Sequence, residues 1–489
     1  MDSTDKQTRK AASRKKNQKR SLTLSAFTII LILTFVLAII TLILPKGSGV
    51  ERATLSGTLL APILGFVDAI DICLFVLILG AFLKVVTKTK ALETGIEVLI
   101  KKLKGHELLL IPILMFLFSI GGTTYGMLEE TVGFYAILSV AMVAAGMDTL
   151  VASSVVLLGA GSGVLGSTIN PFAVGAAVDA LNSLPEPIKV NQGVIIGLGV
   201  ALWLTTYIIS TLFVMAYAKK VINKKGSTFL SLQERKDMEE TYAPKEDKSK
   251  QAPKLTGMQK VTLWLFLLTF VIMIIGFIPW GSFGVHFFEK GKFFSAITGL
   301  PLGEWYFQES TLWFLIMTIV IGVVNGMSEH EFVDTFVDGA DDMVGVILVI
   351  AIARGASVLM SQTHLDTYII SNAAKALEHV SKSVFAPLNY LLHVGLSVLV
   401  PSSSGLASLS TPIMGPLAQK VGYSVEVTLM EMVAANGLVN LFTPTCGAIM
   451  GGLELAKVQY TTWLKWVAKV IVTIAIVNII ILTVAMVIL

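Results

Sequence analysis

Cysteine and charge are both scarce in this sequence. The chain of 489 residues has two cysteines, Cys73 and Cys446, and each lies in a separate apolar run. Two such thiols do not suggest a disulfide framework or a metal site, so we interpret both as small apolar side chains. Charged residues make up 14% of the chain, whereas a typical soluble domain has about 25%. A water-soluble globular fold is therefore excluded.

The motifs of common enzyme classes are missing as well. The segment SEHEF (328–332) lacks the spacing of a zinc-binding H-E-x-x-H helix, and PSSSGL (401–406) lacks the strand context of a G-x-S-x-G nucleophile. Walker and Rossmann glycine patterns do not occur in a soluble segment, and the polar segments are too short for an ATPase. We expect no enzyme activity, no cofactor and no nucleic-acid partner.

The sequence has long apolar runs instead. Hydrophobic residues make up 54% of the chain, and its mean hydropathy is +0.78. Several runs reach the length of about 17 to 20 residues that a helix needs to cross a bilayer. We predict an all-α polytopic membrane protein with about nine spans, located in the cell membrane and in contact with the lipid bilayer.

The distribution of charge divides the chain into segments. The basic tail 1–21 is expected to stay in the cytoplasm by the positive-inside rule. We predict a first transmembrane repeat at 22–218, a cytoplasmic linker at 219–260 and a second transmembrane repeat at 261–489. The linker has eleven Lys or Arg residues, six acidic residues and no apolar run, so we interpret it as solvated.

Each repeat contains two polar, glycine-rich interruptions of its apolar sequence. The first repeat has GGTTYGMLEETVGF (121–134) and GAGSGVLGSTINPFAVG (159–175), and the second has PSSSGLASLSTPIMGP (401–416) and ANGLVNLFTPTCGAIMGG (435–452). Such irregular backbone is tolerated at membrane depth only where it faces protein or a water-filled cavity. Paired interruptions in corresponding halves indicate the binding site of a secondary transporter.

One interruption in each repeat predicts a re-entrant hairpin, at about 108–145 and 384–421. The apolar arm 108–120 has about 13 residues and rises roughly 20 Å, which is too little for a hydrocarbon core of about 30 Å. Two full spans joined by a deep loop are the alternative. The other interruptions predict two broken transmembrane helices, because Pro171 and Pro444 each remove a backbone donor.

The two repeats share one order of elements: span, span, surface helix, hairpin, broken span and span. An additional span at 263–280 makes the second repeat begin on the opposite side, so we predict inverted repeats. Gly146 corresponds to Gly422 and Pro171 to Pro444, and nearly the same length of chain separates the members of each pair.

Glu129 and Glu130 at the first hairpin tip are the leading candidate binding residues. Carboxylates at membrane depth are costly and are functional by default, and an adjacent pair suits a cationic substrate or a proton. The alternative is an open vestibule at the start of a helical arm, where the helix dipole favours acids. Glu431, on the second broken span, is a weaker third candidate.

Small polar side chains at the tips and breaks are candidates for the remaining contacts. Hydroxyl groups and exposed amides could hold a carboxylate, or they could only satisfy the broken backbone. At the breaks, freed carbonyls and amide side chains could coordinate Na⁺ or substrate, or could bond neighbouring helices. If Na⁺ binds, we expect it near Ser167, Asn170 and Asn440. The candidates are Thr123, Thr124, Ser402, Ser403 and Ser404 at the tips and Ser167, Thr168, Asn170, Asn436, Asn440, Thr443 and Thr445 at the breaks.

Three further charged residues lie near the ends of apolar spans. Arg354 is the lone arginine of its span, and it could attract an acidic substrate. Such a residue more often snorkels or pairs with a nearby acid, which is the interpretation we favour. Asp68 and Asp71, at the start of the second span, are expected at the membrane interface rather than in the interior.

At these motifs the sequence resembles the YfcC/ArcD-type basic amino acid antiporters, which are grouped with DcuC-like dicarboxylate carriers. The resemblance rests on GGTTYGMLEE, GSGVLGSTINPFAVG, the serine-rich second hairpin and NGLVNLFTPT, and these motifs extend from Gly121 to Thr445. It implies the ion transporter superfamily, whose members are homodimers of the elevator type, with a transport domain that moves against a scaffold domain. It also implies the exchange of arginine for ornithine across the plasma membrane.

The residues themselves also favour a small amino acid substrate with basic character. The tips and breaks offer two glutamates and no Lys or Arg, whereas a dicarboxylate site normally needs cations. A sodium- or proton-coupled carrier for dicarboxylates or other organic acids is the alternative. A membrane-embedded hydrolase is disfavoured because no nucleophile–base pair is evident.

Overall fold

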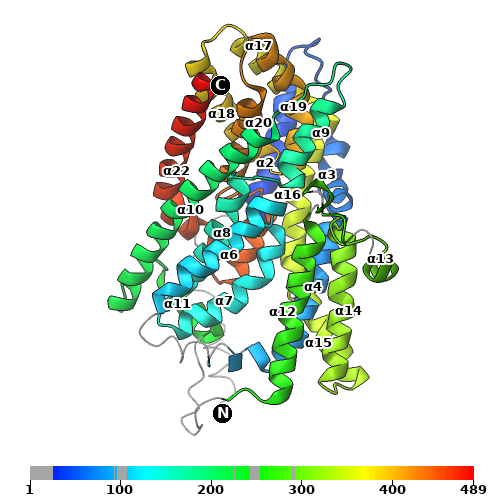
Figure 1. The fold of residues 1–489 in the computed structure, drawn as a ribbon, viewed down its shortest axis with the longest axis vertical. Coiled ribbons are helices and arrows are strands. Elements are labelled where there is room, and N and C mark those ends of the chain that lie inside the picture. Colours follow the sequence, from blue (N-terminus) through cyan, green and yellow to red (C-terminus); the bar gives the residue numbers. More distant parts are fainter. Residues whose placement is uncertain are drawn as a thin grey trace, which may run out of the picture.

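The computed structural model describes residues 26–489, except 93, 96, 97, 99–106, 225, 243–253, 279, 284 and 289–291. Within this part of the chain every regular element is helical, as predicted (Figure 1). Seven helices there are long and apolar enough to cross a membrane: Ile70–Lys88, Glu107–Tyr125, Gln192–Asn223, Gly257–Phe277, Phe307–Val324, Glu329–Gln362 and Tyr460–Ile488. The predicted tail 1–21 and the middle of the predicted linker lie outside the described residues.

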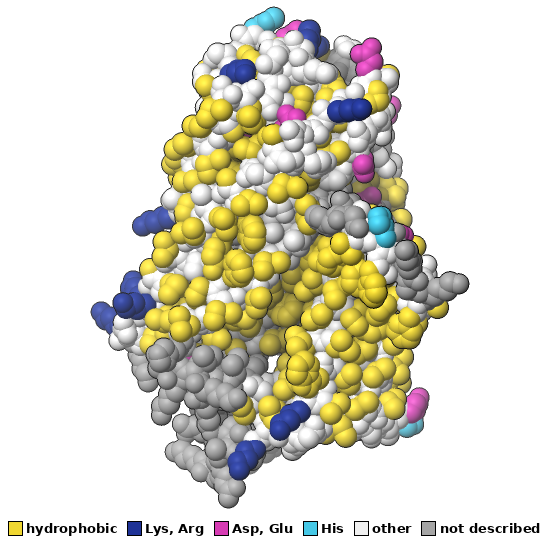
Figure 2. Space-filling view, viewed as in Figure 1, with side chains coloured by type: hydrophobic (Ala, Val, Ile, Leu, Met, Phe, Trp, Pro, Cys, Tyr) yellow, Lys and Arg dark blue, Asp and Glu magenta, His cyan; other side chains and the backbone are white. Residues whose placement is uncertain are grey.

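The surface of the molecule has the pattern of a membrane protein. Figure 2 shows apolar side chains over the middle of one face, with charged side chains mostly toward its ends. On the last helix, α22 (Tyr460–Ile488), the side chains of Val472, Ile476, Ile480 and Val484 are all exposed. They recur at every fourth residue, so they form one apolar stripe that lipid can cover.

One group of helices packs around α3 and α16. A Cβ atom on Gly65 of α3 would lie 2.2 Å from the backbone nitrogen of Gly355 on α16, so the two backbones almost touch. Gly65 also meets Ala351, and Gly355 meets Ala61, which shows that the helices run antiparallel. The group comprises α2 (Ala26–Ile43), α3 (Leu55–Asp68), α4 (Ile70–Lys88), α12 (Gly257–Phe277), α14 (Phe307–Val324), α15 (Glu329–Asp341) and α16 (Val344–Gln362).

A second group of helices contains both predicted hairpins. The arm α6 runs parallel to α8, since Gly159 of α8 meets Met115 and Gly163 meets Ser119. The loop after α6 therefore lies beside the end of α8. The group comprises α6 (Leu110–Tyr125), α7 (Val132–Ala144), α8 (Thr149–Leu165), α9 (Ala176–Asn182), α10 (Gln192–Asn223), α18 (Lys382–Leu399), α19 (Ser403–Lys420), α20 (Val425–Val439), α21 (Gly447–Leu455) and α22.

Short elements connect these helices. They are the turns η1 (Glu107–Leu109), η2 (Glu129–Thr131), η3 (Pro171–Gly175) and η4 (Trp280–Phe283) and the helices α11 (Leu232–Tyr242), α13 (Lys292–Thr298) and α17 (Leu365–Leu377). Of these, η2 and η3 belong to the second group and form part of its first hairpin and first helix break.

Both predicted helix breaks are present. The helix α8 ends at Leu165, and the π-helical turn η3 begins at the predicted proline, Pro171. The helix α20 ends at Val439, and α21 begins at Gly447. Pro171 lacks a backbone donor, and proline disfavours helical backbone at the residue before it, which agrees with a first break at the predicted position.

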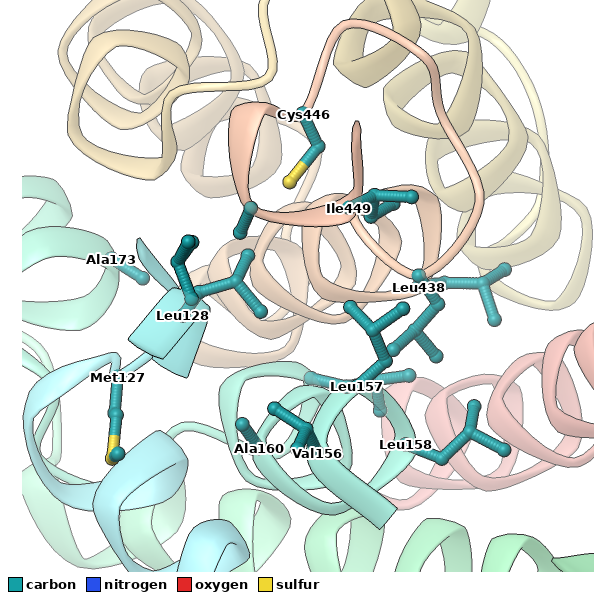
Figure 3. Close-up of a cluster of buried hydrophobic side chains, with 14 of the residues drawn as sticks. Met127, Leu128, Val156, Leu157, Leu158, Ala160, Ala173, Leu438, Cys446 and Ile449 are labelled. Carbon is teal, nitrogen blue, oxygen red and sulfur yellow. The ribbon is translucent and has the colours of Figure 1, made fainter. Parts of the chain in front are cut away.

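The two broken helices cross at their breaks. Gly161 of α8 meets Leu441, and Gly437 of α20 meets Leu165, so the helices run antiparallel. Figure 3 shows the apolar side chains gathered around this crossing, among them Leu157 and Leu438. Such a core fixes the two breaks relative to each other.

The helices follow one another in a similar order twice, from α2 to α10 and from α14 to α22. The pair of α3 and α4 covers 55–88 and the pair of α15 and α16 covers 329–362, so the two pairs are equally long. Gly146 and Gly422, which the sequence pairs, each end the second arm of a hairpin with a positive φ, of 80° and 73°. Glycine adopts this conformation after a helix without strain.

The structure differs from the sequence predictions in three elements. The segment before the second span contains the helix α3, which the sequence did not predict and whose small residues pack on α16. The arm α6 continues through the glycines to Tyr125, so η1 and α6 together have 19 residues. Arm length therefore does not by itself distinguish a re-entrant hairpin from a full span, because the longer arm would reach across about 28 Å.

The third difference is the linker, which is partly docked rather than solvated throughout. Glu234 of α11 is buried, and its carboxylate accepts hydrogen bonds from the Gln459 nitrogen at 2.8 Å and the Thr462 hydroxyl at 3.1 Å. The Tyr242 hydroxyl donates to the Leu455 carbonyl. The reason is capping, since the first amides of α22 lack partners within their own helix.

Candidate functional site

The two hairpin tips and the two helix breaks line one cavity of about 250 Å³. Residues of α3, α4, α14 and α16 complete its wall, so the cavity lies between the two groups of helices. Its charged side chains and most of its other polar ones are Asp68, Asp71, Glu129, Glu130, Asn170, Arg354, Ser402, Ser403, Ser404, Asn440 and Thr445. Seven of the eleven residues predicted to bind substrate are in this set.

The first tip rests on the first helix break. After α6 ends, Gly126 has a φ of 82°, a conformation in which other residues are strained. A Cβ atom there would lie 2.7 Å from the side-chain nitrogen of Asn170, so the contact leaves no room for a larger residue. Asn170 also caps η3, because its Oδ1 accepts from the Phe172 nitrogen at 2.9 Å. One asparagine thus supports both the tip and the restarted helix.

Glu129 and Glu130 follow this tip in η2. Glu130 is 2% exposed, and its Oε2 accepts a hydrogen bond from the Leu128 nitrogen at 3.1 Å. Glu129 is half-buried and lines the cavity. The two carboxylates repel each other, and the charge of Arg354 attracts Glu129 across the cavity. Glu129 is therefore the carboxylate of the pair that is better placed to meet a ligand.

The second tip presents the beginning of α19 to the cavity. Ser402 is its N-cap, and the Ser402 side chain accepts from the Gly405 nitrogen at 3.2 Å. The Ser403 hydroxyl donates to Asn436 Oδ1 at 2.8 Å, and Asn440 Nδ2 donates to the Pro401 carbonyl at 3.0 Å. This tip is thus bound to its own broken helix, as the first tip is. A helix N-terminus with free amides favours a negative group.

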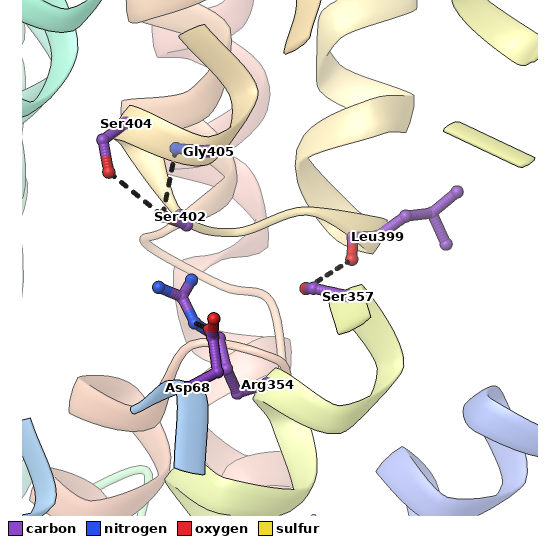
Figure 4. Close-up of polar contacts among 7 residues, drawn as sticks. All are labelled: Asp68, Arg354, Ser357, Leu399, Ser402, Ser404 and Gly405. Atoms are coloured by element: carbon purple, nitrogen blue, oxygen red, sulfur yellow. Dashed lines mark hydrogen bonds and ion pairs between the residues drawn. The ribbon is translucent and has the colours of Figure 1, made fainter. Parts of the chain in front are cut away.

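The wall opposite the second tip has an arginine in an ion pair. Arg354 Nε lies 2.6 Å from Asp68 Oδ2, and the side chains are 25% and 49% exposed. Figure 4 shows this pair facing Ser402 and Ser404. Asp71 lies on the same wall and accepts from Gln308 Nε2 at 3.2 Å. The interpretation of Arg354 as one member of an ion pair agrees with this geometry.

Four predicted binding residues do not line the cavity: Thr123, Thr124, Asn436 and Thr443. The Thr123 hydroxyl donates to the Gly166 carbonyl, and that of Thr124 to Ile120. Asn436 holds Ser403, and the Thr443 hydroxyl bonds Thr445 at 2.7 Å. Their polar groups satisfy the irregular backbone and position the tips, which was the alternative interpretation of these residues.

The predicted sodium ligands are mostly occupied by protein partners. The Ser167 hydroxyl donates to the Val164 carbonyl and accepts from Asn170 Nδ2 at 2.9 Å. Asn170 Oδ1 is used in capping η3. Asn440 Oδ1 is buried and has no hydrogen-bond partner among the described residues. Among these three side chains, it is therefore the oxygen that is available to coordinate a cation.

The sequence did not predict the charged wall of the cavity. Asp68 and Asp71 were expected at the membrane interface, yet they line the cavity beside Arg354. The available signal was two acids, Asp68 and Asp71, at the start of one apolar span and one arginine inside another. These three charges meet because α3 and α16 pack together, and that contact leaves no pattern in the sequence.

The cavity therefore has four carboxyl groups and one guanidinium among its described residues. The guanidinium already has a carboxylate partner in Asp68. An additional anion would have to displace that partner, whereas an additional cation would find unpaired acidic groups. Opposite charges at close range in a partly dry site attract strongly. The cavity thus suits a ligand with more positive than negative charge.

Comparison with known sequences gives a consistent set of relatives. The sequence profile described as DcuC, C4-dicarboxylate anaerobic carrier, matches residues 60–487. An uncharacterised protein of Haemophilus influenzae is 30% identical over 408 residues, which are 83% of this chain and 74% of that protein. YfcC of Escherichia coli, whose name proposes a basic amino acid antiporter, is 28% identical over 409 residues, 81% of this chain and 74% of that one.

Two solved structures are also similar to this chain. One is MtrF of Neisseria gonorrhoeae, described with a class of antimetabolite efflux pumps, which is 16% identical with a TM-score of 0.43 and covers 95% of each chain. The other is the YdaH transporter of Alcanivorax borkumensis, which is 15% identical with a TM-score of 0.45 and covers 94% of this chain and 97% of its own.

Proposed function

Since the chain belongs to the DcuC family of C4-dicarboxylate anaerobic carriers, and is a multi-pass membrane transporter rather than an enzyme, we propose that it exchanges basic amino acids, arginine for ornithine. The observation that supports this substrate is the charge of the cavity, with four carboxyl groups and one paired guanidinium. Arginine at neutral pH has two cationic groups and one carboxylate, so it matches this distribution.

Glu129 is the proposed partner of the substrate side chain. A guanidinium can bind a carboxylate with two parallel hydrogen bonds, and an ammonium can bind it with one or more. The half-buried Glu129 projects from the first tip into the cavity. Its neighbour Glu130 is turned toward the backbone and accepts from Leu128. We assign the binding role to Glu129 and a supporting role to Glu130.

The second tip and the opposite wall are the proposed partners of the substrate α-carboxylate and α-ammonium groups. The free amides at the start of α19, with the hydroxyls of Ser402 and Ser404, offer donors for the carboxylate. Asp68 and Asp71 offer acceptors for the ammonium group. In this arrangement Arg354 changes partner from Asp68 to the substrate carboxylate when substrate binds.

Transport by such a site requires access from each side of the membrane in turn. We propose that the two series of helices are inverted repeats, and that the group with the hairpins moves against the other as in an elevator-type carrier. The support is that α3 with α16, and α8 with α20, pack antiparallel. The cytoplasmic amino terminus and the homodimer implied by family resemblance are part of this proposal.

Dicarboxylate transport is the second candidate, because the family profile is described by that activity. In this case Arg354, released from Asp68, would bind one substrate carboxylate and the amides at the start of α19 would bind the other. The cavity offers no further Lys, Arg or His among its described residues. Four nearby carboxyl groups would repel such a substrate, so we rank it second.

Counterflow into proteoliposomes loaded with ornithine tests the proposal. We expect the purified protein to take up arginine, and succinate to be neither transported nor inhibitory. Glu129→Gln should weaken arginine binding, because truncating one partner of a desolvated charged pair costs about 2–5 kcal/mol. That corresponds to roughly 30-fold or more in affinity. Citrulline, which lacks the side-chain charge, should lose less.

Two controls make this result interpretable. Glu186→Gln removes an exposed carboxylate from the loop after α9, and it should leave arginine affinity unchanged. Glu130→Gln should have a smaller effect on affinity than Glu129→Gln. Uptake of succinate that depends on Arg354 and ignores arginine would replace our proposal with the dicarboxylate function.

A further inference from the structure

A fully buried carboxyl group lies outside the substrate cavity, on α20. Glu431 is 0% exposed and lies in the stretch 427–439, in which every residue is buried. Its Oε2 accepts from Asn389 Nδ2 of α18 at 2.6 Å. Asn389 is also 0% exposed. The pair therefore joins the first arm of the second hairpin to the broken helix that carries Asn436 and Asn440.

Each side chain of this pair has one oxygen without a hydrogen-bond partner among the described residues. These oxygens, Glu431 Oε1 and Asn389 Oδ1, are both buried. Both are acceptor atoms if the carboxyl group is ionised. A proton on Oε1 would turn one of them into a donor. A carboxylic acid and a carboxamide then form two parallel hydrogen bonds, with O–H donating to Oδ1 and Nδ2–H donating to Oε2.

The charges around Glu431 do not favour the ionised form. His393 of α18 is a titratable member of the same network, and its Nδ1 donates to the Asn389 carbonyl at 2.8 Å. Its Nε2 bonds the Ser410 hydroxyl of α19 at 2.7 Å, so the neutral ring is fully satisfied. A buried carboxylate without a cation costs several kcal/mol even after relaxation. The proton removes that cost.

The other titratable groups on the helices around α20 are engaged elsewhere or exposed. The Tyr390 hydroxyl meets Asn478, and the hydroxyls of Tyr207, Tyr217 and Tyr460 donate to Pro112, Asp148 and Phe442. The lysines of α10, α19 and α22 are exposed, and Lys382 begins α18 two helical turns before Asn389. The helix α8 and the turn η3 contain no titratable side chain.

The corresponding contact in the first half of the chain is apolar. There α6 packs on α8 through Met115, Phe118 and Gly159. A hairpin arm can thus pack on a broken helix without a carboxyl group, so packing alone does not explain Glu431. Polar groups buried in a membrane protein are costly and usually have a functional role.

The pair lies near a small cavity and is linked along α20 to the substrate cavity. A cavity of about 10 Å³, close to the size of one water molecule, is lined by His393 and Thr428 among others, each within four residues of Asn389 or Glu431 along its helix, and not by the pair itself. Along α20, Asn436 follows Glu431 by about one and a half turns. Asn436 accepts from Ser403 of the second tip. A change at Glu431 would thus act on the helix that holds this tip.

We propose that Glu431 and Asn389 form a proton-binding site that couples proton movement to transport. In the described conformation the proton is bound to Glu431 Oε1 and donated to Asn389 Oδ1. On release, the O–H bond breaks, the proton passes to a water molecule, and Glu431 keeps the electron pair as a carboxylate. This proposal rests on the chain being a transporter and does not depend on which solute it carries.

Infrared spectroscopy of the wild-type protein and Glu431→Gln tests the site without a substrate. The glutamine side chain reproduces both hydrogen bonds of the protonated pair, so the variant should fold like the wild type. We expect the wild type to show a carbonyl band of a protonated, hydrogen-bonded carboxylic acid that the variant lacks. Glu426→Gln removes a carboxylate from the first turn of the same helix, and it should keep this band.

Binding measurements across a range of pH test the coupling. With the solute identified by counterflow, wild-type affinity should change by up to about tenfold per pH unit, because one proton is linked to binding. In Glu431→Gln the slope should fall toward zero, and in Glu426→Gln it should remain. If Glu431→Gln does not fold, Glu431→Met combined with Asn389→Leu replaces the pair with apolar groups and should also abolish the slope.

Three results would overturn the proposal. The acid band could persist in Glu431→Gln, the slope could be the same in this variant and in the wild type, or Na⁺ at fixed pH could stabilise the wild type and not the variant. The last result would make Glu431 a sodium ligand. A failure to transport arginine would overturn the proposed function but leave the infrared result unaffected.

Discussion

The parallel packing of α6 on α8 makes a strong prediction about Gly163. A Cβ atom on this residue would lie 2.0 Å from the Ser119 carbonyl oxygen and 2.6 Å from the Thr123 nitrogen. Both are backbone atoms of α6, so neither can rotate away, and the helices would have to separate. Overpacking of this kind typically costs about 1–3 kcal/mol. We expect Gly163→Ala to reach the upper end of that range.

The separation should also reach the substrate cavity. The Thr123 carbonyl accepts from the Thr168 nitrogen at 3.0 Å, and this bond ties the end of α6 to the first helix break. A displaced α6 would move the tip that precedes Glu129. We therefore expect Gly163→Ala to weaken substrate binding as well as stability.

The assay is the thermal unfolding midpoint of purified protein, together with substrate affinity. Gly197→Ala is a matched control, since Gly197 is a helical glycine of α10 at which an added Cβ atom would meet nothing within 4 Å among the described residues. Alanine there should be neutral or stabilising by about 0.4–1 kcal/mol. Equal midpoints for the two variants would refute the close parallel packing and the hairpin built on it.

Two further predictions concern the docked linker and the native cysteines. Glu234→Ala should lower the unfolding midpoint, because losing hydrogen bonds to a buried charged group costs about 1.5–3 kcal/mol. As a control, Glu240→Ala removes an exposed carboxylate and should change stability by less than about 0.5 kcal/mol. Equal effects of the two substitutions would mean that α11 is not docked. In Cys73→Ala, a small membrane-permeant thiol reagent should label Cys446, which lines the cavity, and substrate should slow the reaction. Protection of Cys73 in Cys446→Ala instead would contradict the position of the cavity.

The helix breaks and the turns that follow the predicted hairpin arms could be predicted because their causes are local. Pro171 removes a backbone donor wherever it stands, and Gly146 and Gly422 permit turns that other residues resist. The helix α3 was missed because its helical character is clear only from what it packs against. Its glycine and alanine residues contact α16, which belongs to the second half of the chain. Contacts of that kind leave no local pattern.

The candidate site was predictable to a similar degree. The tips and breaks come together as expected, because their polar residues cannot face lipid. Which hydroxyls face the cavity could not be predicted, since Thr123 and Ser403 have equally available hydroxyls in sequence and differ only in their partners. The partners of Glu431 were also hidden, because Asn389 belongs to another helix.

The positions of the charges in the two helix groups suggest why an empty carrier and a loaded one would behave differently. Arg354 and Asp68 belong to the same group of helices, so their ion pair would survive the proposed movement of the two groups against each other. Glu129 belongs to the other group, whose described residues place no basic side chain in the cavity. A basic amino acid held between Glu129 and Arg354 would tie the two groups together through its own charges. Glu431 and Asn389 lie within one group, so in the proposed movement a proton bound there would travel with that group and need not cross the cavity.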